Sequence, residues 1–216
     1  MSQSLNEIEA LAKKATRGAG RAWGIAEEAG KATRWLESFG LPGGSALADL
    51  LDATDGVAAD TVSPVRLASP WSAPSGLLCP LAAGATLSDF SDHLTEGSAL
   101  ELQGLSHPIL IVPFAAWAAA HLGKPIRLRW HSISVETDGF GVSLQDTQGR
   151  ITAPDQVAVT CQISTSGQAT MTLPGERGQI EPSARDRLSR LAGRTYAPAT
   201  EESRALGAGA GASDND

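Results

Sequence analysis

The stretch ATRGAGRAWG, residues 15–24, places three glycines beside two arginines, a composition found in loops that hold phosphate groups. A dinucleotide-binding glycine loop requires a strand before it and a helix after it. Here a capped helix is expected before the glycines, because residues 4–7 (SLNE) form a capping box and apolar side chains follow at helical spacing. The stretch therefore predicts a turn between two helices, in which glycine adopts a left-handed backbone conformation at little cost.

Helices are predicted on both sides of this turn, at residues 5–17 and 22–38, and a third is predicted at 45–53. The second helix carries a stripe of small side chains, Ala22, Ala26, Ala29 and Thr33, and such a stripe lets a neighbouring helix approach closely. We therefore expect the first two helices to pack as an antiparallel hairpin.

The rest of the chain predicts a mixture of helices and strands. Helices are expected at 86–94, 113–123 and 183–192, and strands at 99–103, 109–114, 125–131, 156–164 and 168–173. Asp138-Gly139 lies at the centre of the alternating residues 133–144, which is a strong signal for a hairpin. The fold class predicted is α+β, with an N-terminal helical hairpin, a mixed α/β middle and an antiparallel β-meander covered by helices.

The composition changes along the chain predict four segments. They are an N-terminal helical region (1–59), an extended connector rich in proline and serine (60–76), an α+β core (77–196) and a flexible Gly/Ala-rich acidic tail (197–216). Trp71 is expected to pin the connector to the body of the protein.

The chain has 216 residues and a formal net charge of −7, whereas a general binder of nucleic acid or of anionic membranes presents a basic surface. Neither partner is therefore expected. The charge is uneven, because Arg66 is the only Lys or Arg between residues 38 and 123, a segment that carries many Asp and Glu. We expect the basic ends of the chain to pack near this acidic middle.

The N-terminal residues MSQSLNEIEA contain neither the basic nor the apolar region of a secretory signal. No apolar run approaches the roughly 20 residues that a membrane helix needs. Cys79 and Cys161 are the only cysteines and lie far apart in the sequence, which favours reduced thiols. The expectation is a cytoplasmic protein.

Two groups of arginines are candidates for binding anions. The first lies at the turn, where free N–H groups at the start of the second helix and two guanidinium groups favour a carboxylate or a phosphate. The second lies along the last helix, where arginines at i, i+3 and i+7 share one face and suit an acidic ligand. The candidates are Arg17, Gly20, Arg21, Arg187, Arg190 and Arg194. For the second group, a solvated face balanced by nearby acidic residues is the alternative.

The four histidines show no catalytic or metal-binding pattern. None is paired with another at i+4, and the H-E-x-x-H motif does not occur. Asp89, Asp92 and His93 fall on one helical face, which we interpret as a solvated face rather than a metal site. No metal or cofactor is expected, and no catalytic residue is identified.

The last ten residues, GAGAGASDND, offer almost no side-chain area to bury. Asp214, Asn215 and Asp216 nevertheless form a compact negative cluster, which suits an arginine-lined groove on a partner subunit or on this chain. These three residues are the candidates for partner binding. A solubilising tail with no further role is the alternative.

Two stretches of the chain resemble an uncharacterised bacterial family that carries a domain-of-unknown-function label. They are SLNEIEALAKKATRGAGRAWGIAEEAGKATRWL (residues 4–36) and RTYAPATEESRALGAGAGASDND (residues 194–216). The resemblance implies a bacterial cytoplasmic protein, and it transfers no activity and no catalytic residue.

Two functions remain open from the sequence. The first is a non-catalytic accessory or binding subunit that works beside a metabolic enzyme, with another protein subunit as its partner. The alternative is a small enzyme that acts on an anionic metabolite, held by arginines and processed by a histidine as acid and base. A pocket in which Arg and His converge favours the enzyme, and a flat apolar patch without a pocket favours the accessory role.

Overall fold

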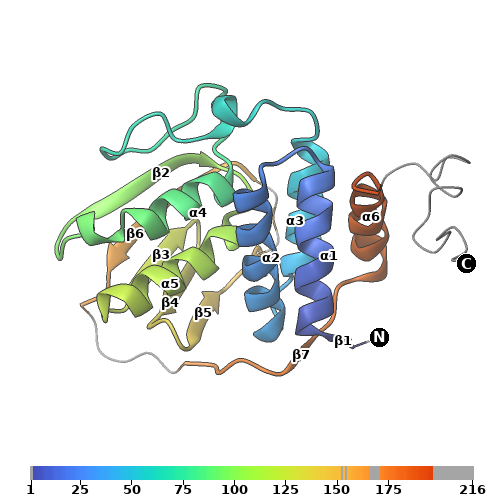
Figure 1. Ribbon diagram of the computed structural model, residues 1–216. Coiled ribbons are helices and arrows are strands. Elements are labelled where there is room, and N and C mark those ends of the chain that lie inside the picture. Colours follow the sequence, from blue (N-terminus) through green and yellow to red (C-terminus); the bar gives the residue numbers. More distant parts are fainter. Residues whose placement is uncertain (1, 152, 154, 166–170, 197–216) are drawn as a thin grey trace, which may run out of the picture.

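The computed structural model describes residues 2–151, 153, 155–165 and 171–196, and it shows an α+β protein (Figure 1). Helices α4 and α5 lie across a five-stranded antiparallel sheet, and a bundle of α1, α2, α3 and α6 stands beside them (Figure 1). The predicted fold class is confirmed.

The helical bundle is built around the predicted hairpin. Its members are α1 (Leu5–Gly18), α2 (Trp23–Ser38), α3 (Gly43–Ala53) and α6 (Pro182–Gly193). The capping box opens α1, because the Ser4 hydroxyl accepts from the Glu7 N–H at 3.2 Å and the Glu7 carboxylate accepts from the Ser4 N–H at 2.9 Å. A two-stranded pairing of β1 (Gln3–Ser4) with β7 (Arg177–Gly178) leads α6 to its place beside α1.

The sheet has the strand order β2-β6-β3-β4-β5, and every pair in it is antiparallel. Its strands are β2 (Ala99–Leu105), β3 (Ile126–Trp130), β4 (Ile133–Thr137), β5 (Val142–Asp146) and β6 (Val157–Ile163). The helices on it are α4 (Pro80–Asp89) and α5 (Val112–Leu122). Three short 3₁₀ turns, η1 (Ala59–Val62), η2 (Ser91–His93) and η3 (Pro108–Ile111), complete the elements.

Two predicted elements were wrong. Residues 109–114 form η3 and the start of α5 rather than a strand, because a short, wholly buried apolar run looks the same in either structure. The helix expected at 86–94 begins earlier, at Pro80. Proline is well suited to the first helical position, because the N–H that it lacks would have no partner within the helix. Thr86 therefore lies inside α4, where its hydroxyl donates to the Ala82 carbonyl.

The meander holds for β3, β4 and β5, which follow one another in sequence and in space. Strand β6 instead enters the sheet between β2 and β3, so it does not pair with the strand expected at 168–173. Of that segment, residues 168–170 lie outside the described residues, and Thr172 makes a single bridge to Val142 at the edge of β5.

One hydrophobic core joins the helical bundle to the sheet. Leu36 of α2, Phe114 of α5 and Leu128 of β3 are all buried in it. A Cβ added to Gly84 would lie 2.3 Å from the ring of Phe114, so glycine lets α4 approach α5 closely. The opposite face of the sheet is polar, with Arg127 paired to Glu136 across β3 and β4.

Candidate functional site

The turn that follows α1 uses its glycines in two different ways. Gly18 is the last residue of α1, and a Cβ there would lie 1.8 Å from the carbonyl oxygen of Leu191 in α6. Gly18 therefore lies within α1 and permits close packing against α6. We had expected the helix to end before it, at residue 17. Gly20 has a φ of 85° and forms the turn itself. A helix precedes these glycines, so they lack the strand that a dinucleotide loop requires.

Arg21 points into the protein and not toward an external anion. Only 6% of it is exposed, and its guanidinium donates to the carbonyls of Thr54 at 2.7 Å and Val57 at 3.1 Å. These carbonyls lie at and just beyond the C-terminal end of α3, where unpaired carbonyls carry partial negative charge. The guanidinium of Arg21 thus links the turn to the end of α3. Its role in binding an anion stays a prediction.

The arginines of α6 face a row of aspartates along α3. Arg187 donates to Asp49 and Asp52, at 2.6 Å each, and hydrogen bonding to Asp49 raises the pKa of Arg187. Arg194 donates to the carboxylate of Asp55 at 2.8 Å. The expectation that basic ends pack near the acidic middle is confirmed at these pairs, and two of the three candidate arginines are engaged by the chain itself.

Arg190, the third candidate on α6, is exposed, and no hydrogen bond or ion pair of it is seen within the described part of the chain. The candidates for partner binding, Asp214, Asn215 and Asp216, lie outside the described residues.

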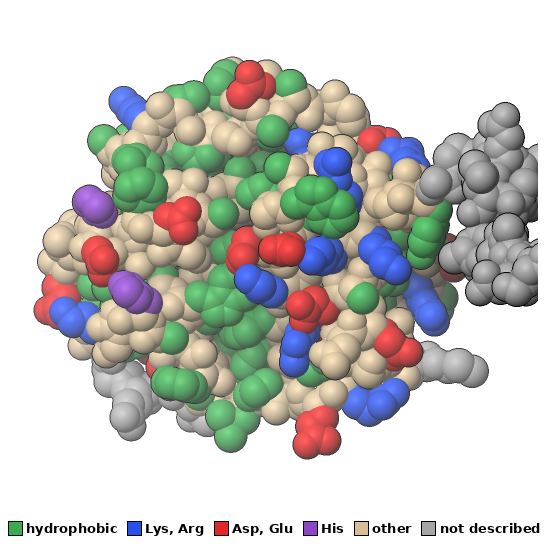
Figure 2. Space-filling model, viewed as in Figure 1, with side chains coloured by type: hydrophobic (Ala, Val, Ile, Leu, Met, Phe, Trp, Pro, Cys, Tyr) green, Lys and Arg blue, Asp and Glu red, His purple; other side chains and the backbone are tan. Residues whose placement is uncertain are grey.

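A basic hollow of about 740 Å³ lies where α1, the turn and the end of α6 meet. We use this name for the surface lined by Lys13, Lys14, Arg17, Trp23 and Arg194. Lys and Arg side chains gather over α1, α2 and α6 in Figure 2. Gly20 also lines the hollow, and a Cβ added to it would meet no atom within 4 Å, so the space above the turn is open.

The cations of the basic hollow differ in their partners. Lys13 pairs with Glu27 at 2.7 Å, and Arg194 is paired with Asp55. Neither Lys14 nor Arg17 has a carboxylate partner among the described residues. Helix α2 begins at the hollow with no capping side chain and no acidic residue in its first turn. The hollow therefore keeps a positive charge that favours an anion.

Sequence analysis missed Lys14 and Trp23 as members of this surface. The signal was present as two adjacent lysines and an arginine three residues later on one helix, followed by a tryptophan at the start of the next helix. Which of these side chains stay free of carboxylates depends on where Glu27 and Asp55 fall in the folded bundle.

An aromatic groove of about 710 Å³ lies between α2, α5 and the turn that joins β4 to β5. It is lined by Trp35, Phe39, Trp117 and Phe140, and the rings of Trp35 and Phe39 are 4.3 Å apart between centroids. Figure 2 shows hydrophobic side chains filling a hollow in this part of the surface. The groove gathers large apolar side chains from elements that are distant in the sequence.

The β4–β5 turn holds Phe140 in the groove with 75% of the residue exposed. The Asp138 carboxylate accepts from the N–H groups of Phe140 and Gly141, at 2.9 Å each, and the Thr137 hydroxyl donates to the Gly141 carbonyl at 2.7 Å. Although burial acts in the opposite direction, the hydrogen bonds from Gly141 and Phe140 lower the pKa of Asp138. The predicted hairpin at Asp138-Gly139 is confirmed.

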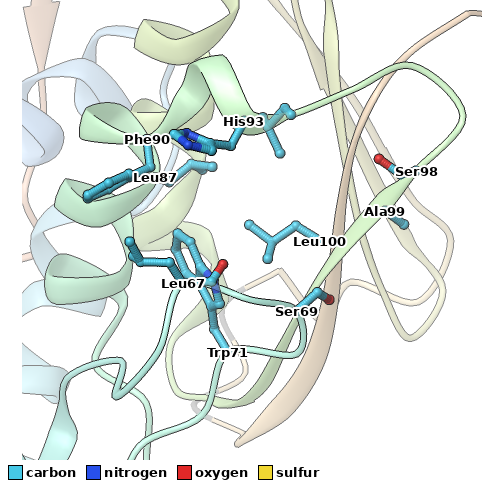
Figure 3. Close-up of a pocket in the computed structure, with 10 residues that line it drawn as sticks. Leu67, Ser69, Trp71, Leu87, Phe90, His93, Ser98, Ala99 and Leu100 are labelled. Carbon is cyan, nitrogen blue, oxygen red and sulfur yellow. The ribbon is translucent and has the colours of Figure 1, made fainter.

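A smaller connector pocket of about 250 Å³ lies between residues 67–71, the end of α4 and strand β2 (Figure 3). Trp71 is buried at its base, where the indole N–H donates to the Leu67 carbonyl at 2.9 Å and the backbone N–H donates to Glu101 of β2 at 2.8 Å. The expectation that Trp71 pins the connector is confirmed. Phe90 and His93 line the opposite side (Figure 3), so the pocket offers apolar walls with one imidazole.

The four histidines are dispersed, and none of them lines the basic hollow. His93 lies in the connector pocket, His121 contacts Asp92 at 3.1 Å on the surface, and His131 occupies a turn with a φ of 47°. Within the described residues, no group of three His, Cys, Asp or Glu side chains is placed to hold a metal ion.

Comparison with known proteins finds a similarity to a family model in the N-terminal part of the chain. Residues 3–99 match the family model described as a protein of unknown function (DUF3726). The DUF3726 match covers α1, α2, α3, the connector and α4, and it confirms the resemblance stated for the N-terminal stretch. Neither a search of curated proteins nor a search of solved structures found a match. Across the part of the chain that the structure describes, no helix is long and apolar enough to span a membrane.

His107 is the most unusual side chain in the core. It is 5% exposed, and its backbone is left-handed, with a φ of 45°. Neither ring nitrogen has a hydrogen-bond partner among the described residues. Burial lowers the pKa of His107; Asp49 raises it and Arg187 lowers it further. The folded protein thus disfavours the protonated form of this imidazole. The neutral ring is also unfavourable in this position, because a buried polar group without a partner costs free energy.

We expect this histidine to make the protein less stable as the pH falls. Below about pH 6.5 the unfolded chain takes up a proton at residue 107 that the folded chain resists, so the free energy of unfolding declines, by at most about 1.4 kcal/mol per pH unit. The decline ends at the lower pKa of the native state. Urea denaturation of the wild type and of His107→Asn between about pH 7.5 and 5 measures it.

Asparagine is the matched replacement, because it tolerates the left-handed backbone and does not titrate in this range. The wild type should lose stability relative to His107→Asn as the pH falls. Equal losses in the two proteins would show that burial of His107 does not govern the acid response.

Proposed function

We propose that this chain is a non-catalytic binding subunit that docks onto another protein, a metabolic enzyme in our expectation, through the aromatic groove. The observation that carries the proposal is Phe140, which is 75% exposed on a turn fixed by several hydrogen bonds. Covering this exposed aromatic ring with a partner removes apolar area from water, which is favourable.

The surroundings of the groove fit a protein partner. Two more aromatic side chains, Trp35 and Trp117, are only partly buried and would gain further burial on docking. Charged pairs border them, with Arg34 and Glu9 2.9 Å apart and Lys31 also on the lining. An apolar centre within a polar rim is typical of protein–protein interfaces, and aromatic side chains commonly carry most of their binding energy.

The geometry favours this function over the enzyme alternative. An enzyme that anchors an anionic metabolite with arginine and processes it with histidine needs both side chains in one pocket. The basic hollow contains Arg17 and no histidine in its lining, whereas His93 lies in the apolar connector pocket. The aromatic groove needs no such convergence, because exposed apolar area is itself the feature that a partner recognises.

The proposal includes a cytoplasmic location. Cys79 and Cys161 are both free and buried, and burial raises the pKa of Cys161 to about 12. Such thiols are unreactive in the folded protein, and free thiols are usual in a reducing compartment. Labelling of an epitope-tagged chain in fractionated cells tests the location.

We expect Phe140→Ser to weaken the association with the partner at least about tenfold, as substitution of an aromatic residue at the centre of an interface does. The test is quantitative affinity purification of the tagged chain from its host, followed by a titration with the recovered partner. Val65→Ser is the matched control, since Val65 is 60% exposed on the connector, outside the lining of the groove. Both variants should fold as stably as the wild type, within about 0.5 kcal/mol. If Phe140→Ser binds the same partner with wild-type affinity, the groove is not the docking surface.

A further inference from the structure

We propose that the basic hollow is a second binding site, which takes a small anionic ligand with a planar ring, of the nucleoside phosphate class. Lys14 and Arg17 would hold the anionic group, and Trp23 would stack on the ring. This inference is independent of the aromatic groove, which lies at the other end of the α1–α2 hairpin.

Two cations of the hollow have capacity left for a ligand. Arg17 uses one N–H, from Nη1, to donate to the Arg21 carbonyl at 2.8 Å, and a guanidinium has five such donors. Lys14 is exposed, with its ammonium 3.4 Å from the Tyr196 hydroxyl. The positions of these side chains on α1 differ by three residues, so both lie on the same side of the helix. An incoming phosphate can therefore contact both.

Trp23 supplies the planar surface. It is the first residue of α2 and is 60% exposed. Arg17 lies 5.2 Å and Lys13 5.9 Å from the centroid of its ring, so the indole is already held beside the cations. An aromatic platform beside guanidinium and ammonium groups suits a ring that carries phosphate, because stacking and charge act on the same molecule.

The hollow also has the size and openness for such a ligand. Its volume of about 740 Å³ falls within the range of roughly 300–1,000 Å³ that is usual for small-molecule sites. Gly18 and Gly20 in its lining project no side chain into it. The site is thus formed by the glycine-rich turn, although the cations come from the preceding helix and the ring comes from the following one.

Isothermal titration of the full chain at low salt tests the proposal with three probes. ADP carries both features, adenosine carries only the ring, and inorganic pyrophosphate carries only the charge. We expect ADP to bind at least about tenfold more tightly than either of the others, and more weakly as salt is added. Absence of ADP binding up to about 1 mM would overturn the proposal.

Variants then assign the contacts. Trp23→Ala should raise the Kd of ADP about tenfold and leave that of pyrophosphate unchanged, since it removes only stacking. Lys14→Gln and Arg17→Gln should raise the Kd of both probes. Lys14 is exposed, and among the described residues its ammonium is hydrogen-bonded to Tyr196 and not to the turn, so its variant tests the charge even if Arg17→Gln disturbs the turn. Arg190→Gln is the control, because it removes the same charge from a residue outside the lining of the hollow. If Trp23→Ala and Lys14→Gln both leave the Kd of ADP unchanged, the ligand binds elsewhere.

Discussion

Gly18→Ala is expected to lower the free energy of unfolding by about 3 kcal/mol, at the upper end of what overpacking costs. The added methyl group would lie 1.8 Å from the Leu191 carbonyl oxygen and 2.7 Å from its carbonyl carbon. Both are backbone atoms of α6, so no side chain can rotate away, and α1 and α6 must separate. Chemical denaturation with a linear extrapolation measures the change.

Gly24→Ala is the matched control, six residues further along the same stretch. A Cβ added to Gly24 meets no atom within 4 Å, and the residue is exposed in the first turn of α2. Its variant should be as stable as the wild type or more stable by up to about 1 kcal/mol, because alanine restricts the unfolded chain more than glycine does. If Gly18→Ala and Gly24→Ala have equal stability, α1 and α6 do not pack as closely as the structure shows.

Arg21→Met is expected to destabilise the protein by a similar amount, about 3 kcal/mol. Methionine preserves much of the buried aliphatic chain but removes the charged donor to the Thr54 and Val57 carbonyls, and a hydrogen bond from a charged group contributes about 1.5–3 kcal/mol. It also removes the cation at the C-terminal end of α3, whose carbonyls it neutralises. The unfolding free energy and the amide exchange rates of α3 report the loss.

Arg190→Met provides the comparison for Arg21, because Arg190 is an exposed arginine on α6. Its variant should change the unfolding free energy by no more than about 0.5 kcal/mol. A wild-type stability for Arg21→Met would mean that water replaces the guanidinium at these carbonyls without cost, and Arg21 would again be a candidate for external ligands.

The helical hairpin could be predicted because its signals are local. The capping box at Ser4 and Glu7, the helical spacing of apolar residues and the glycine turn act within a few residues of chain, and the structure has these helices within one residue of the predicted limits. The β4–β5 hairpin is similar, because Asp138 and Gly139 determine the turn by their own conformational preferences.

The apolar run at residues 109–114 could not be assigned in the same way. It is buried on every side, beneath α2 and α4 and against the sheet, so no polar positions reveal its period. The place of β6 between β2 and β3 was equally hidden, because the pairing of strands distant in sequence depends on which apolar faces meet in the core.

The positions of the candidate arginines follow from the local sequence, whereas their partners follow from the packing of distant elements. The sequence located the charges and the glycine-rich turn, since helix limits follow from local interactions. Because α3 packs against α6 and the turn, Arg21 donates to the Thr54 carbonyl and Arg187 donates to the Asp49 carboxylate. Arg17 donates to a backbone carbonyl and keeps further N–H groups for a ligand. The physical reason is that the function of a charge depends on the nearest opposite charge or dipole, and that neighbour is supplied by a different part of the chain.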